Sequence, residues 1–146
     1  MAKCEYSGAE EFVSKLDKLT RRETIRRIVM AGAEACVEKT RDAIDHYRHV
    51  GETGSMKSNV RPGDYHEDLG SGYVYVYPQG EDPRGISNAV KAFVINYGRG
   101  GNPTRRGTKN KTGDKFITGQ KASMQEVVSA AMQAESDRII QEVNGG

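Results

Sequence analysis

Residues 20–47 decide the fold, and they read TRRETIRRIVMAGAEACVEKTRDAIDHY. Apolar and small residues recur at helical spacing along the whole stretch. Thr20 and Glu23 fit a capping box, in which a hydroxyl and a carboxylate satisfy free N–H groups at a helix start. Gly51 is placed to act as the C-cap. The stretch therefore predicts one long helix, whose recurring positions are Ile25, Val29, Gly32, Ala33, Cys36, Thr40, Ala43, Ile44 and Tyr47.

Four small residues stand close together in the middle of this predicted helix: Ala31, Gly32, Ala33 and Ala35. Short side chains allow the backbone of a neighbouring element to come close, because the distance between packed helices depends on the side chains at the contact. We therefore expect another element to approach the long helix closely along this part.

Two further helices are predicted, one on each side of the long one in the sequence. Ser7 and Glu10 fit a second capping box, which opens a short helix with Phe12, Leu16 and Leu19 on one face. Residues from about 120 to 143 predict a last helix. Its apolar stripe also contains Glu135, so the packed surface is either incomplete or completed by a partner. The other stripe residues are Met124, Val128, Ala131, Met132, Ile139 and Val143.

The middle of the chain has β-strand character. Residues 73–77, YVYVY, alternate aromatic and β-branched side chains, and Pro78 ends the run. Tyr73, Tyr75 and Tyr77 would share one face of this strand. Residues 91–97, KAFVINY, predict a second strand, and the turn-rich residues 78–88 would join the two as a long hairpin loop.

The order of these elements defines the expected fold class. Residues 59–69 allow a further strand, although Pro62 and Gly63 disfavour it. The predicted order is helix, helix, strand, strand, helix. We therefore expect an α+β fold in which the short, long and C-terminal helices cover one face of a small antiparallel sheet that carries a long basic loop.

The composition indicates a small core. Leu, Ile, Val and Phe make up 26 of the 146 residues, which is below the roughly 20% at which disorder becomes a concern, but the formal net charge is only +2. One domain over residues 1–146 is expected. No membrane-spanning run or secretory signal is present in the sequence, which predicts a soluble protein made in the cytoplasm. Oligomerisation would complete such a small core.

The charge is distributed unevenly. Residues 99–121 carry seven basic groups and one acid, whereas residues 51–98 and 122–146 are net acidic. Within residues 98–113, GRGGNPTRRGTKNKTG, five residues are glycine and no apolar side chain is present apart from proline. This segment is predicted to be a long, flexible, exposed loop or arm. Its basic residues are Arg99, Arg105, Arg106, Lys109 and Lys111.

Three roles remain open for this basic arm. It can contact an acidic neighbouring subunit, it can be merely solvated, or it can neutralise nucleic-acid phosphates without reading sequence. No aromatic residue is interleaved in residues 98–113, so stacking on single-stranded bases is not expected. The tyrosine face likewise has two readings, a subunit interface or ordinary sheet packing under the helices.

Other sequence patterns do not support enzyme or metal chemistry. Residues 51–58 resemble a phosphate-binding loop, but Met56 replaces a required glycine and the segment follows a helix. His46 and His49, with Asp42 and Asp45 one turn earlier, have a spacing compatible with metal ligands, but we prefer to interpret them as a polar helix end, where partly charged His favours the helix dipole. No nucleophile is recognisable, and the two cysteines, Cys4 and Cys36, form neither a zinc motif nor a disulfide framework. We expect no catalytic, cofactor or metal residues.

Four features together resemble a known family. They are the short-then-long helical region, residues 53–58 (TGSMKS), residues 91–98 (KAFVINYG), and the basic loop that leads through Lys115 and Phe116 into a C-terminal helix. In this order they are similar to the tail-completion proteins of long-tailed bacteriophages and prophages. These are also described as neck, head–tail joining or minor tail proteins. The resemblance extends from about residue 12 to residue 143.

The resemblance implies a non-enzymatic virion structural protein. Such a subunit would assemble into a ring, often a hexamer, at the head-proximal end of the tail. Its partners would be further copies of itself, the tail-tube or terminator protein and the head connector, and it would be made in the host cytoplasm. The residues that reach a neighbour would then be Tyr73, Tyr75 and Tyr77 together with the basic arm. The alternative function is a small non-specific nucleic-acid-binding module that uses the arm.

Overall fold

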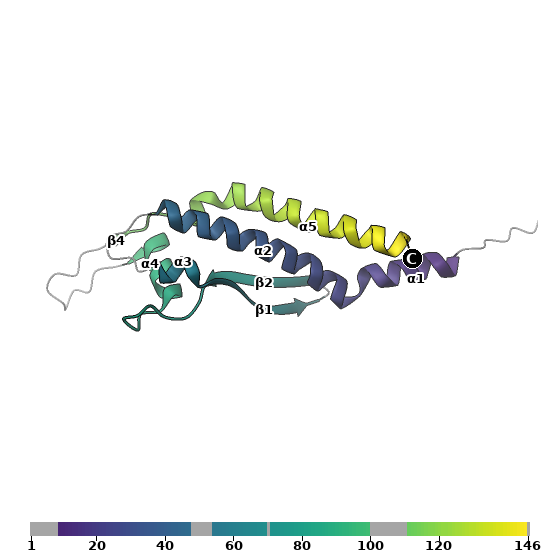
Figure 1. Ribbon diagram of the computed structural model, residues 1–146, viewed down its shortest axis with the longest axis horizontal. Helices are drawn as coiled ribbons and strands as arrows, with labels where there is room; N and C mark the ends of the chain where they lie inside the picture. Colours follow the sequence, from purple (N-terminus) through teal and green to yellow (C-terminus); the bar gives the residue numbers. More distant parts are fainter. Residues whose placement is uncertain (1–8, 48–53, 70, 100–110, 146) are drawn as a thin grey trace, which may run out of the picture.

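The computed structural model of the chain describes residues 9–47, 54–69, 71–99 and 111–145, and it has the expected α+β class. Its elements run from two helices through a hairpin to a final long helix (Figure 1). The helices are α1 (Ala9–Thr20), α2 (Arg22–His46), α3 (Ser55–Ser58), α4 (Asn88–Tyr97), the 3-10 helix η1 (Thr118–Gln120) and α5 (Lys121–Asn144). The strands are β1 (Val60–Asp68), β2 (Ser71–Pro78), β3 (Gly98–Arg99) and β4 (Lys111–Thr112).

Helix α2 is the central element, with α5 along one side and the β1–β2 hairpin along the other (Figure 1). The close approach expected at the small residues is confirmed at Gly32. A β-carbon built there would lie 2.7 Å from Cγ of Met132 and 3.3 Å from a methyl of Val128, both on α5. A side chain at position 32 would therefore force Met132 to move, and glycine allows the two helices to approach without that shift.

Glu135, on the apolar stripe of α5, is paired with two arginines. The Glu135 carboxylate is nearly buried and accepts hydrogen bonds from Arg27 of α2 at 2.8 and 3.1 Å and from Arg138 at 2.7 Å. Arg27 also donates to Glu142 at 2.9 Å. The contacts with Glu142 and Glu135 raise the pKa of Arg27, so it stays charged. The Glu135 carboxylate on the apolar stripe is therefore paired within the chain.

Strands β1 and β2 form a two-stranded antiparallel sheet in which Val60 pairs with Pro78 and His66 with Tyr73. The register shifts between Pro62 and Tyr65, and this bulge absorbs the Pro-Gly pair that disfavoured a strand. The strand that the sequence allowed over residues 59–69 is therefore present as β1, and it pairs with β2. Residues that pair across the two strands lie on the same face of the sheet. The face that carries Val60 and Val76 packs against α2.

The core lies where the C-terminal half of α2 meets α3, the open end of the hairpin and α4. Met56 and Val60 are almost fully buried, with exposed fractions of 1% and 0%. Tyr47, Val76 and Phe116 are partly buried and pack against this cluster. The remaining buried members are Val37, Ile44, Ala92 and Ile95.

The prediction of a strand over residues 91–97 is wrong, because these residues belong to helix α4. Ser87 is the N-cap, and its hydroxyl accepts a hydrogen bond from the N–H of Val90. Ala92, Ile95 and Asn96 point into the core, whereas Val90, Phe93 and Tyr97 are exposed. Side chains that are apolar on both faces obscured the helical period and imitated a strand.

The predicted ends of the long helix are also corrected. Thr20 does not cap α2; its hydroxyl donates to the carbonyl of Leu16 and so belongs to the end of α1. Arg21 is the N-cap and makes no side-chain capping bond. At the other end α2 stops at His46, and the N–H of Tyr47 donates to the carbonyl of Ile44. The predicted caps Ser7 and Gly51 lie outside the described residues.

Candidate protein-interaction surface

The outer face of the hairpin carries Tyr73, Tyr75 and Tyr77, which we name the tyrosine face. Their exposed fractions are 42%, 65% and 43%. The predicted sharing of one face is confirmed, since Val74 and Val76 alternate with them on the side toward α2. Tyr73 stacks on His66 of β1 at 5.3 Å between ring centroids and meets Tyr75 edge-on at 5.5 Å. Within the described part of the chain no element covers this face.

A second exposed apolar surface lies on α4. Val90, Phe93 and Tyr97, which we name the α4 ridge, have exposed fractions of 58%, 62% and 61%. They follow one another at three- and four-residue spacing, so they form one line along the helix. The rings of Phe93 and Tyr97 are 4.9 Å apart. A line of large exposed apolar side chains is typical of an interaction surface, and no described residue covers the ridge.

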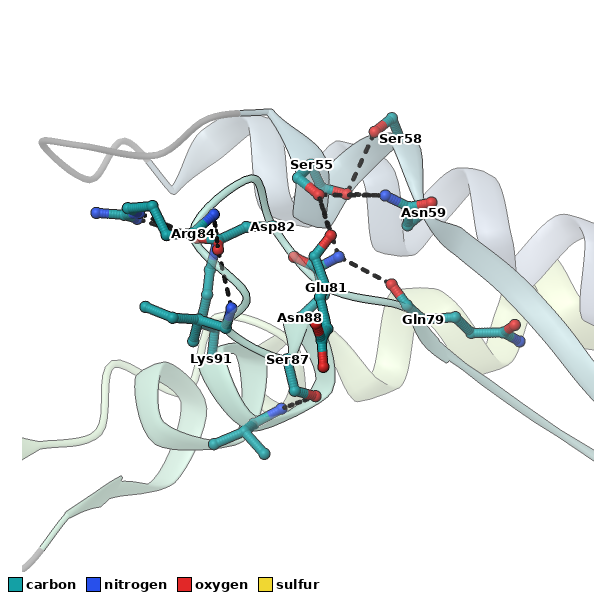
Figure 2. A network of polar contacts seen from close by, with 12 residues as sticks. Ser55, Ser58, Asn59, Gln79, Glu81, Asp82, Arg84, Ser87, Asn88 and Lys91 are labelled. Carbon is teal, nitrogen blue, oxygen red and sulfur yellow. Dashed lines mark hydrogen bonds and ion pairs between the residues drawn. The ribbon is translucent and has the colours of Figure 1, made fainter.

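Asp82 fixes the loop that carries the chain from β2 into α4 (Figure 2). Its buried carboxylate accepts from the backbone N–H groups of Arg84 at 2.9 Å and Ile86 at 3.0 Å. It also accepts from the side chains of Arg84 and Lys91. The backbone bond from Ile86, together with the bonds from Arg84 and Lys91, lowers the pKa of Asp82 to about 2. The carboxylate is therefore charged at neutral pH and holds the start of α4 in place.

Asn88 connects the same loop to α3 (Figure 2). Its side chain is fully buried, and its amide donates to the carbonyl of Gln79 at 2.8 Å and to the hydroxyl of Ser55 at 3.2 Å. Ser55 in turn donates to the carbonyl of Glu81. These bonds tie α4, α3 and the end of β2 together. The α4 ridge is thus held at a fixed orientation relative to the hairpin.

The root of the basic arm is an ordered ladder rather than a loop. Gly98 pairs with Thr112 and Arg99 with Lys111, as strands β3 and β4. Next to them, a β-carbon on Gly113 would lie 2.4 Å from the carbonyl oxygen of Asn96, so the two backbones touch. The expectation of a flexible loop over all of 98–113 is therefore wrong for its two ends. Residues 100–110, with Arg105, Arg106 and Lys109, lie outside the described residues.

Asn96 secures the chain beyond the arm. Its buried side-chain oxygen accepts from the N–H groups of Ile117 at 3.0 Å and Thr118 at 3.1 Å. The N–H of Asp114 donates to the carbonyl of Ile95 at 2.8 Å. Both ends of the arm are therefore fastened to α4 over several residues.

Tyr47 adds a side-chain contact between α2 and the segment after the arm. Its ring packs on Phe116 at 5.1 Å between centroids. Burial, followed by a hydrogen bond with Asp114, raises the pKa of Tyr47 to about 12. Because the neutral phenol is the form that the fold favours, this contact stabilises the protein below pH 10 and is lost as the pH rises toward 12.

The remaining candidates from the sequence are placed as follows. A ring nitrogen of His46 lies 2.7 Å from the backbone carbonyl of Asp42, and His49 lies outside the described residues. Over the ranges that the structure describes, no group of three potential metal ligands is found. Met56, in the segment that resembled a phosphate loop, is a core residue. The α4 ridge was not predicted from the sequence. The signal that could have found it is Ser87, a residue type that commonly caps the start of a helix.

Comparisons with known proteins add no relative. No protein-family model matches the chain, and no curated protein or solved structure is significantly similar to it. None of the helices in the described ranges is long and apolar enough to cross a membrane.

Proposed function

We propose that the chain is a non-enzymatic structural subunit that joins the head and tail of a long-tailed phage. As a tail-completion or neck subunit it would assemble into a ring at the head-proximal end of the tail. The observation that carries this proposal is the tyrosine face, which is aromatic, ordered and uncovered on a sheet of only two strands. A two-stranded hairpin depends on packing against other elements for its stability, and within the described residues only its face toward α2 is packed. The resemblance in sequence supports the choice of a phage neck as the assembly.

The side chains exposed on these surfaces support a role in assembly rather than catalysis. The exposed side chains of the tyrosine face and the α4 ridge are large and apolar, which is typical of protein interfaces. Asp82, the residue whose pKa is lowered to about 2, is sequestered in a loop and bonded to backbone N–H groups, as in a structural turn. Further copies of the chain, the tail-tube or terminator protein and the head connector are the proposed partners.

The test combines size-exclusion chromatography with light scattering on the full chain. The proposal predicts an oligomer, either for the chain alone or after addition of tail-tube, terminator or connector protein. A chain that remains a monomer with every one of these partners contradicts it.

The same samples test the alternative of nucleic-acid binding by the arm. Binding of duplex DNA would have to weaken steeply with salt and to weaken less steeply in the variant Arg105→Ala/Arg106→Ala/Lys109→Ala/Lys111→Ala. This result from a chain that stays monomeric would replace the proposal.

A further inference from the structure

Two of the uncovered apolar surfaces in the described part of the chain are of different kinds. The tyrosine face belongs to a sheet, and the opposite face of the same sheet is already covered by a helix, α2. The α4 ridge belongs to a helix whose other side is already in the core. Sheets and helices are stable when each buries its apolar face against another layer. The tyrosine face has no helix packed on it, and the α4 ridge has no apolar layer packed against it.

The two surfaces do not cover each other within one chain. Both remain exposed, although α4 follows β2 directly. The bonds of Asp82 and Asn88 set the loop between them and hold α4 beyond the open end of the hairpin (Figures 1 and 2). Within the described ranges no element of the chain covers either surface, which points to a second molecule as the cover.

We propose that the α4 ridge of one copy packs on the tyrosine face of the next copy. This inference rests on the proposed function and specifies how neighbouring subunits join. The contact is head-to-tail, because a different surface is used on each side, and repetition of such a contact closes into a ring when the rotation permits.

Dimensions support the match. The ends of the α4 ridge, Val90 and Tyr97, are seven positions apart, or about 10 Å at the helical rise. The ends of the tyrosine face, Tyr73 and Tyr77, are four positions apart, or about 13 Å at the strand rise. Aromatic side chains bury roughly 200 Å² each, so three residues near half exposure give about 300 Å² on either side. Together the two sides would supply the apolar half of an interface of about 1,200 Å², the lower end of stable interfaces.

Charge sets the direction of the contact. The basic arm root, with Arg99 and Lys111, follows the C-terminal end of α4. The hairpin tip carries Asp68, which is exposed and forms no ion pair with any residue in the described ranges. The ridge would therefore lie with Tyr97 toward Tyr73 near the tip and Val90 toward Tyr77, which brings the opposite charges together.

Disulfide cross-linking between single-cysteine variants tests both the contact and its direction. All proteins carry Cys4→Ser and Cys36→Ser, so the introduced thiol is the only one. A mixture of Tyr97→Cys and Tyr73→Cys chains should form a covalent dimer under mild oxidation. A mixture of Val90→Cys and Tyr77→Cys chains should do the same. Each variant alone should give at least tenfold less dimer, and so should the control mixture of Tyr97→Cys with Tyr77→Cys.

Other outcomes overturn the inference. Efficient dimers of Phe93→Cys with itself would indicate a symmetric contact between two α4 helices. A preference for the control mixture would reverse the direction. Absence of cross-links in a chain that oligomerises by light scattering would refute this contact while leaving the proposed function intact. Absence of both cross-links and assembly, with the phage partners present, would refute both proposals.

Discussion

The two sides of α2 use their apolar residues differently. On one side, α2 and α5 form a helix pair that meets closely at Gly32 and pairs even its inward carboxylate, Glu135, with Arg27. On the other side, the hairpin and α4 leave the tyrosine face and the α4 ridge in solvent. On the first side the contact between the two helices, with its inward carboxylate, is satisfied within one chain. The second combines a firm polar framework with open apolar surfaces, which is the combination that a subunit interface needs.

The largest expected effect separates core from surface on the hairpin side. Met56→Ala removes a side chain that is 1% exposed and should lower the free energy of unfolding by about 3 kcal/mol. The matched control Phe93→Ala removes a larger, exposed side chain and should cost less than about 0.5 kcal/mol. Urea unfolding followed by circular dichroism measures both. An equal loss in the two variants would mean that the α4 ridge belongs to the core.

The next effect tests the completeness of the helix pair. Glu135→Ala leaves Arg27 and Arg138 without their shared, nearly buried acceptor and should cost about 2 kcal/mol. Glu126→Ala, at an exposed position of the same helix, serves as the control and should change stability by less than about 0.5 kcal/mol. A neutral Glu135→Ala would show that the ionic group is dispensable, and the distinction between the two sides would weaken.

A pH-dependent effect follows from Asp82. Its pKa is lowered to about 2, so the stability that it supplies is complete above pH 4 and is lost as the pH falls toward 2. Asp82→Asn should lower the melting temperature at pH 7 by about 5 °C and should flatten the decline in stability between pH 4 and pH 2. Asp64→Asn, at an exposed position, is the control. Parallel acid profiles for the wild type and Asp82→Asn would contradict the role given to this carboxylate.

The smallest effect concerns the fastening of the arm. Tyr47→Phe removes the hydrogen bond to Asp114 but keeps the ring packing on Phe116, so it should cost about 1 kcal/mol at pH 7. The wild type should lose stability as the pH rises from 10 toward 12, and the variant should lose less over that interval. Thermal unfolding across this pH range measures the difference. Identical stability profiles for the two proteins would contradict the stabilising role given to the Tyr47 hydroxyl.

The sequence predicted the elements that follow one clear period. The stripe of α2, the alternation in β2 and the stripe of α5 each have one buried face, so the period identified the element. Residues 91–97 were wrongly predicted as a strand because apolar residues occupy both sides of the helix. Ala92 and Ile95 are buried, while Val90, Phe93 and Tyr97 are exposed. A helix with apolar side chains on its exposed side as well as its buried side has no polar face to mark its period.

The candidate surface was predicted in part. The shared face of Tyr73, Tyr75 and Tyr77 followed from strand geometry alone. The partner of Glu135 did not, because Arg27 stands 108 residues earlier and only tertiary packing brings the two together. The ordered arm root was also missed, since two short strands and the fit of Gly113 on the backbone of Asn96 depend on long-range contacts.

The most direct test of the central claim compares the assembly of three proteins by light scattering under identical conditions. They are the wild type, the tyrosine-face variant Tyr73→Ser/Tyr75→Ser/Tyr77→Ser, and the control Val127→Ser/Ile140→Ser, which changes exposed apolar residues of the helix pair. We predict that the wild type and the control assemble alike, whereas the tyrosine-face variant is a folded monomer. Assembly of the tyrosine-face variant at the wild-type level would contradict the claim that the hairpin side joins the subunits.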